Sequence, residues 1–364
     1  MRIWDSWRRF DLALFGTAML LAVVGLVLVY SASHHSNALG HLVWKQLLWL
    51  AMGTLMLSFF FIVDYQSLVH GAYLFYGAVL LLLVLLVLFG RQSTGGSARW
   101  FNLGLFYVQP SELAKLALIL AMTRWVSEHD REIKTFWGLL PPLGLMGLMM
   151  GLILKQPDLG TALVLFPVAF VILLVAGARL WHLGLILFMG LASTPLLWHF
   201  LKDYQRRRWI SFIQPESDAL GAGYNAIQSG IAIGSGGFFG KGFLQGTQSQ
   251  LNFVPMHHTD FIFSVLAEEW GWLGCAVVLG LYLALLLQAV KISVSSKDLR
   301  GTLLGSGVVA MLTTQVIFNV GMTSGVLPVT GITLPLLSYG GSSVVTVMIC
   351  LGILLNIRRE SSGA

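Results

Sequence analysis

Long runs of apolar residues, separated by short polar stretches, dominate this chain. A helix that crosses a bilayer needs about 20 mostly apolar residues, and this measure predicts ten spans. The runs do not alternate as the strands of a membrane barrel do, so the pattern predicts an all-α polytopic membrane protein. The expected spans are 11–31, 43–63, 67–89, 112–127, 137–154, 159–177, 180–199, 261–290, 302–322 and 342–357.

The composition agrees with this pattern. Of the 364 residues, 56% are hydrophobic and 10% are charged, whereas a soluble domain carries about 25% charged residues. Cys275 and Cys350 lie inside apolar runs, which indicates core residues rather than a disulfide framework or a metal site. Neither an appended soluble domain nor an internal repeat is evident, so we expect residues 1–364 to form a single membrane domain.

The positions of lysine and arginine predict the orientation. With the N-terminus inside, twelve of the 22 Lys and Arg residues fall in inner segments, and the short outer loops and rims hold five. Because cytoplasmic loops carry the excess of positive charge, we expect both termini in the cytoplasm and a large outer loop, about 200–260, between spans seven and eight. The net charge of +6 therefore reflects topology in the cytoplasmic (inner) membrane, and no nucleic-acid partner is expected.

Two features of the outer loop, an arginine triplet and a glycine-rich stretch, raise the question of a phosphate-bearing ligand. The stretch Asp203–Trp209 holds three consecutive arginines, and arginine makes bidentate contacts with phosphate; a lipid-headgroup anchor is the alternative. Gly221–Gly246 holds nine glycines, but Gly242 follows Lys241 where a phosphate-binding P-loop has Ser or Thr. The glycines therefore favour a tightly packed loop over a nucleotide site.

Carboxylates gather just before and inside the eighth span. Asp260 ends the sequence His-His-Thr-Asp, and Glu268 would share its face if the helix began there. Carboxylates at a membrane rim usually face a cavity and act in it, although Asp260 could also be a simple helix N-cap. A zinc site using His257 and Asp260 lacks a third ligand, so no metal site is predicted.

Other charged residues of the outer rim have individual structural explanations. Glu112 and Lys115 could form an i,i+3 ion pair, Asp158 could cap a helix, and Arg99 could anchor Trp100 at the interface. Together with the arginine triplet, Lys241 and Asp260, they lie on one side of the membrane. That convergence suits an anionic molecule that carries sugars or a lipid.

Ten short blocks carry a strong resemblance to one known family. In order, they are Gln109–Lys115, Gln156–Thr161, Gly223–Ser229, Ala232–Gly237, Gly246–Ser249, His258–Phe263, Ala267–Glu269, Asn319–Met322, Leu327–Gly331 and Ser338–Ser343. At these blocks the chain resembles the SEDS family (shape, elongation, division and sporulation), and the Gly246 block is more like its elongation members than its division members. One departure is Met256, because relatives often have Glu after the proline.

The resemblance implies a peptidoglycan glycosyltransferase that polymerises lipid II during cell elongation. Lipid II is the undecaprenyl-diphosphate-linked disaccharide-peptide, and the reaction would take place at the outer face of the cytoplasmic (inner) membrane. It also implies partnership with a class B penicillin-binding protein transpeptidase and the elongation machinery. The family's essential aspartate falls on Asp260, the catalytic candidate. The substrate-binding candidates are Arg99, Glu112, Lys115, Asp158, Arg206, Arg208, Lys241, His258 and Glu268.

The chemistry assigns Asp260 the role of general base toward the acceptor hydroxyl. Cations such as Lys115, Arg206, Arg208 or Lys241 would neutralise the departing diphosphate. No cofactor is predicted, and a divalent cation (Mg²⁺ or Mn²⁺) is left open. The alternatives are a lipid II flippase, although transporter sites typically lie near the midplane, and a non-catalytic scaffold.

Overall fold

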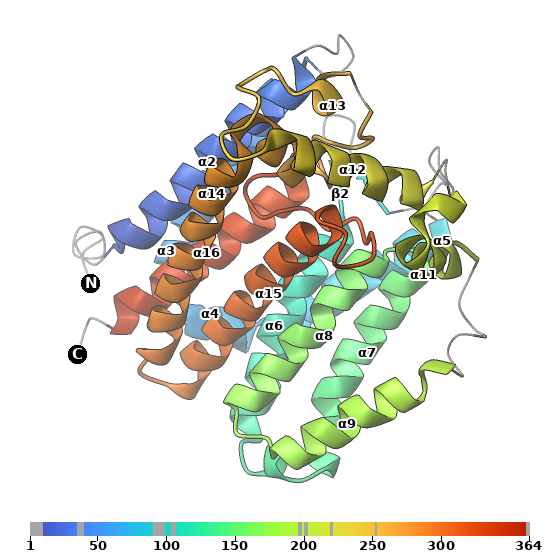
Figure 1. Ribbon diagram of the computed structural model, residues 1–364. Helices are drawn as coiled ribbons and strands as arrows, with labels where there is room; N and C mark the ends of the chain where they lie inside the picture. Colours follow the sequence, from blue (N-terminus) through green and yellow to red (C-terminus); the bar gives the residue numbers. More distant parts are fainter. Residues whose placement is uncertain are drawn as a thin grey trace.

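The computed structural model describes residues 10–34, 40–89, 99–102, 107–195, 199, 203–218, 221–251 and 253–361. Figure 1 shows long helices packed side by side, with shorter helices across one end. The long or apolar helices are α2 (Leu12–Ser33), α3 (Leu42–Ile62), α5 (Ala72–Phe89), α6 (Pro110–Glu128), α7 (Leu140–Lys155), α8 (Leu159–Val175), α9 (Leu180–Ala192), α14 (Ile262–Val294), α15 (Leu299–Thr323) and α16 (Gly341–Ser361).

These helices confirm the predicted all-α polytopic membrane fold. Each expected span coincides with one of them. Among the described residues, seven segments are long and apolar enough to cross a membrane, and α8 and α9 are shorter apolar helices. Helix α6 has 19 residues but is less apolar, because it carries Glu112, Lys115 and Arg124. The shorter elements are α4 (Tyr65–His70), η1 (Glu132–Lys134), η2 (Trp137–Leu139), α11 (Asp203–Ile213), η3 (Pro215–Asp218), α12 (Ala222–Gly236) and α13 (Thr247–Gln250).

Three local features differ from the expected spans. The third span is divided at Gly71 into α4 and α5. The eighth begins at Ile262 and is interrupted at Gly271, where φ is 66°. A two-stranded antiparallel hairpin, β1 (Phe101–Asn102) and β2 (Tyr107–Val108), lies before α6. Two-residue strands are too short to leave a periodic signal in the sequence.

Helix α16 is the central helix, with 89% of its most apolar window buried. Its C-terminal end is fixed by Asn356, whose amide donates to the carbonyls of Phe61 (2.7 Å) and Val63 (2.8 Å) and accepts from Tyr65 N–H (3.1 Å). These bonds satisfy backbone groups that the end of α3 and the start of α4 leave unpaired. One buried amide therefore joins three helices.

The short helices α11, α12 and α13 lie at the end of the bundle opposite the two termini (Figure 1). The loop after α12 packs on the interruption in α14: Trp272 N–H donates to the Gly237 carbonyl (2.9 Å) and Leu273 N–H to Phe238 (3.1 Å). A Cβ at Gly240 would lie 2.1 Å from the Glu269 carbonyl oxygen. Close backbone approach thus explains why this loop is rich in glycine.

Candidate active site

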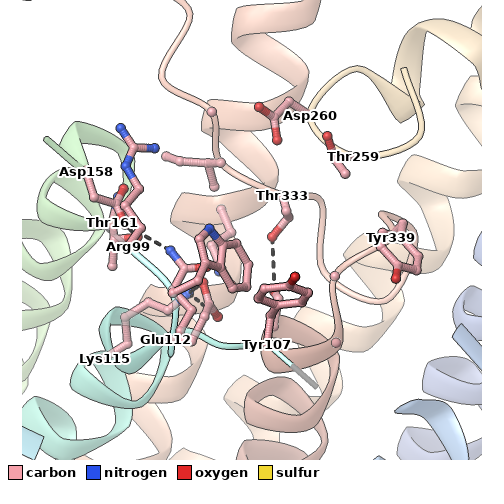
Figure 2. Close-up of a pocket in the computed structure, with 18 of the residues that line it drawn as sticks. Arg99, Tyr107, Glu112, Lys115, Asp158, Thr161, Thr259, Asp260, Thr333 and Tyr339 are labelled. Carbon is pink, nitrogen blue, oxygen red and sulfur yellow. Dashed lines mark hydrogen bonds and ion pairs between the residues drawn. The ribbon is translucent and has the colours of Figure 1, made fainter. Parts of the chain in front are cut away.

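A cavity of about 890 Å³ lies at the same end of the bundle as the short helices, between α3, α5, α6, α8, α15 and α16. It brings together five residues that the sequence singled out. Figure 2 shows Asp260 on one wall, Arg99 and Asp158 across from it, and Glu112 and Lys115 on α6. Further lining residues include Lys45, Trp49, Trp100, Tyr107, Gln109, Thr161, Met256, Thr259, Gln315, Gly331, Thr333, Tyr339 and Ser343.

Asp260 belongs to the loop that precedes α14. The N-cap of α14 is Phe261, so Asp260 is not the N-cap, and the expectation that it shares a helical face with Glu268 is wrong. The loop is held through backbone groups. Asn319 Nδ2 donates to the Asp260 carbonyl (2.9 Å), and Ser338 Oγ donates to the Thr259 carbonyl (2.6 Å). The carboxyl group is therefore positioned by α15 and by the segment before α16.

Gly331 forms the backbone wall beside this carboxylate. Its φ is +77°, and a Cβ built on it would lie 3.3 Å from Asp260 Oδ2. Only glycine adopts that backbone conformation at little cost. The peptide chain can therefore pass directly beside the acid group without a side chain between them.

The surroundings of Asp260 make it suitable as a base near neutral pH. Burial raises the pKa of Asp260 to about 6, and the negative charge of Asp158 acts in the same direction. A hydrogen bond from Thr259 and the positive charges of Arg208 and Arg99 oppose the rise in pKa. A base whose pKa lies near the working pH is both ionised and basic enough to accept a proton.

Asp158 forms a hydrogen-bonded anchor on the opposite wall. Its carboxylate accepts from Ser111 Oγ (3.0 Å), Gln109 Nε2 (3.0 Å) and Thr161 Oγ1 (2.9 Å), and from the Thr161 N–H (3.2 Å). The last bond is the N-cap of α8 that the sequence suggested. Arg99 Nε donates to the Gln156 carbonyl (3.3 Å), so this arginine is fixed against the same turn.

Glu112 and Lys115 form the i,i+3 ion pair considered from the sequence. Lys115 Nζ lies 2.8 Å from the Glu112 carboxylate, and their side chains are 2% and 8% exposed respectively. Two charges so deeply buried require each other, because an unpaired buried charge is strongly destabilising. The pair presents a nearly neutral polar surface to the cavity.

The other five candidates lie outside the cavity lining. Lys241 forms an ion pair with Glu268 (2.8 Å), and Arg206 donates to the His199 carbonyl. Arg208 donates to the Thr330 carbonyl (3.2 Å), yet its charge reaches Asp260. Burial and the positive field of His257 lower the pKa of the fifth candidate, His258, to about 4. A neutral His258 offers no charge to a diphosphate.

The part of the chain that the structure describes contains no group of three or more His, Cys, Asp or Glu side chains that could hold a metal ion. The two ring nitrogens of His257 face the carbonyls of Val254 (2.9 Å) and Ala32 (2.8 Å), which leaves neither for zinc. His257 is therefore not a zinc ligand, and no step of the reaction is assigned to a divalent cation.

Sequence reasoning missed several lining residues. Lys45 in the first turn of α3, Tyr107 in the hairpin and Gln315 within α15 all face the cavity. Gln315 carried the clearest signal, since it is a polar residue inside an apolar span. Its importance depends on which face of α15 meets the cavity, and that is set by tertiary packing.

Comparison with known proteins identifies the class. The family model described as "Cell cycle protein", covering FtsW, RodA and SpoVE, matches residues 11–363. MrdB of Escherichia coli, named a peptidoglycan glycosyltransferase, is 42% identical over 76% of this chain and 75% of its own. The peptidoglycan glycosyltransferase RodA of Treponema pallidum is 35% identical over 96% of this chain and 97% of its own.

A solved structure agrees with these relatives. It matches with a TM-score of 0.85 and 35% identity, covers 98% of this chain and 99% of its own, and comes from work on how a peptidoglycan synthase complex coordinates polymerisation and crosslinking. The chain belongs to the FtsW, RodA and SpoVE family, which is the SEDS family. The prediction of a RodA-like peptidoglycan glycosyltransferase is confirmed at the level of family and enzyme class.

Proposed function

We propose that this protein polymerises lipid II into glycan strands at the outer face of the cytoplasmic membrane during cell elongation. The observation that carries the proposal is Asp260, a carboxyl group with a pKa of about 6 on the wall of a cavity of about 890 Å³. The cavity lies in a bundle of apolar helices. Its lining combines charged, amide and hydroxyl groups with aromatic and aliphatic side chains, which suits a substrate that carries both sugars and a lipid.

In the proposed reaction Asp260 takes the proton from the acceptor sugar's hydroxyl as its oxygen attacks the donor's anomeric carbon. The new carbon–oxygen bond forms as the bond to the polyprenyl diphosphate breaks, and the diphosphate leaves as an anion. Displacement with inversion converts an α-linked donor into a β-linked glycan. Arg99, which lines the cavity, and Arg208, whose charge reaches Asp260, are the proposed cations for the leaving group. Lys115 and Lys241 are already paired with Glu112 and Glu268.

We further infer that the whole chain, residues 1–364, works as one unit, with its cavity open to the periplasm. A class B penicillin-binding protein is the proposed partner. The similar structure of a synthase that couples polymerisation to crosslinking supports this partnership. The partner would crosslink the strands that this chain makes.

The test is polymerisation of lipid II by the purified full-length chain together with a class B penicillin-binding protein. Asp260→Asn keeps the size of the side chain but cannot accept the proton, so we expect product formation to fall at least about 100-fold. Asp130→Asn, at the opposite end of the bundle, makes the same chemical change at an exposed site and is the matched control. A folded Asp260→Asn protein with the wild-type rate would refute the base assignment.

A further inference from the structure

Gln315 is a buried amide in the cavity wall whose polar atoms have no protein partner among the described residues. It lies in the outer half of α15, is 1% exposed and lines the cavity that contains Asp260. Its Oε1 is buried and makes no hydrogen bond. An unsatisfied buried polar group is costly, so such an amide indicates a group that binds there.

The position of Gln315 along α15 can be compared with the level of Asp260. Asn319, four residues further along α15, donates to the Asp260 carbonyl at 2.9 Å. Residues four apart share a face of a helix, and the rise between them is about 6 Å. Gln315 therefore lies about one helical turn below the level of Asp260, on the side of α15 that meets the cavity.

One turn of helix is close to the length of a single sugar ring. A sugar that presents its hydroxyl to Asp260 would thus extend its far side toward Gln315. Both sugars of peptidoglycan carry a 2-acetamido group, whose N–H and C=O complement the C=O and NH₂ of a glutamine amide. The nearby Glu112–Lys115 pair is internally neutralised, so the pocket floor suits a neutral amide better than a free ion.

We propose that Gln315 recognises the acetamido group of the acceptor sugar and makes the enzyme selective for N-acetylated acceptors. The inference rests on the proposed function, since it assigns a part of that substrate to a part of that cavity. Gln315 is a specificity-determining residue in this scheme. The proton transfer itself remains with Asp260.

The experiment is a single-coupling assay with the full-length protein and its penicillin-binding partner. The donor has its own acceptor hydroxyl blocked, and the acceptor lipid II is either N-acetylated or de-N-acetylated on its terminal sugar. We expect wild-type protein to prefer the acetylated acceptor by about tenfold or more in kcat/KM, because a site built for a hydrogen bond rejects the analogue that lacks it. Gln315→Leu should reduce that preference to about twofold or less, mainly by losing activity on the acetylated acceptor.

The matched control is Gln288→Leu. Gln288 lies in α14, its Oε1 is also buried without a partner, and its Nε2 donates to Thr17. It does not line the cavity, so its replacement should leave the acceptor preference intact. If Gln315→Leu does not fold, Gln315→Glu provides a second variant of nearly the same shape.

The outcomes distinguish failure of the Gln315 proposal from failure of the polymerase proposal. Equal kcat/KM for both acceptors in the wild type, or an undiminished preference in folded Gln315 variants, would overturn the role of Gln315 while leaving the polymerase intact. Absence of any product from the wild type with either acceptor would overturn the polymerase proposal itself, and this inference with it.

Discussion

The chemistry at Asp260 depends on opposing influences on one carboxyl group. Burial raises its pKa, and so does the charge of Asp158, whereas Arg208 and Arg99 lower it. The result, about 6, leaves the group ionised at neutral pH. Because the proposed base acts only when it is deprotonated, the polymerisation rate should fall as the pH drops through about 6.

Replacing Arg208 with Gln tests this balance. Loss of the positive charge removes an influence that favours the ionised carboxylate, so the pKa of Asp260 should rise further. The acid limb of the pH–rate profile should then move to higher pH by up to about one unit. Arg207→Gln removes a neighbouring charge that is exposed to solvent and therefore more strongly screened, so its acid limb should stay close to that of the wild type. Identical profiles for wild type and Arg208→Gln would contradict the assignment.

Among the contacts between elements, the carboxylate of Glu268 connects α14 to the segment that follows α12. Its carboxylate accepts from Lys241 Nζ (2.8 Å), the Gln248 N–H (2.8 Å) and the Ser249 N–H (3.0 Å) and hydroxyl (3.0 Å). The two N–H groups belong to the first turn of α13, where backbone donors lack partners within the helix. This side chain therefore acts as a cap supplied from a distant helix, and it lies outside the cavity.

Glu268→Gln should accordingly affect stability more than substrate affinity. The glutamine would lose the ion pair and would place an NH₂ group against backbone donors, which costs about 1–3 kcal/mol at a buried site. We expect a lower unfolding temperature in detergent and an unchanged KM for lipid II. A raised KM at wild-type stability would instead support the substrate-binding role that the sequence suggested for Glu268.

Sequence reasoning located the elements well because apolar length is a local property. The spans followed from run length, and their ends placed Asp260, Glu112, Lys115, Asp158 and Arg99 on one side of the membrane, where these residues line one cavity. A linear pattern could not show which distant residues the side chains of a loop would contact. The sequence offered Lys241 as a cation for the leaving diphosphate, but the loop after α12 packs on α14 and pairs Lys241 with Glu268. Pairing across such a distance along the chain leaves no local pattern.

The proposed polymerisation requires that the cavity of the whole molecule open on the side of the membrane opposite both termini. The structure places the cavity and the short helices α11, α12 and α13 at one end of the bundle and the termini at the other (Figure 1). Lipid-linked sugars can be polymerised outside the cell only if the cavity end is the periplasmic end. The distribution of lysine and arginine predicts this orientation.

Cysteine labelling in whole cells tests that orientation. Gln245 is exposed in the loop after α12, and Asp130 is exposed between α6 and α7 at the opposite end. A membrane-impermeant maleimide, admitted to the periplasm but not to the cytoplasm, should label Gln245→Cys in intact inner membranes and Asp130→Cys only after the inner membrane is opened. The native Cys350 is buried and Cys275 partly buried, so the unmodified chain supplies the background. The reverse pattern would place Asp260 on the cytoplasmic side and would contradict polymerisation at the outer face of the membrane.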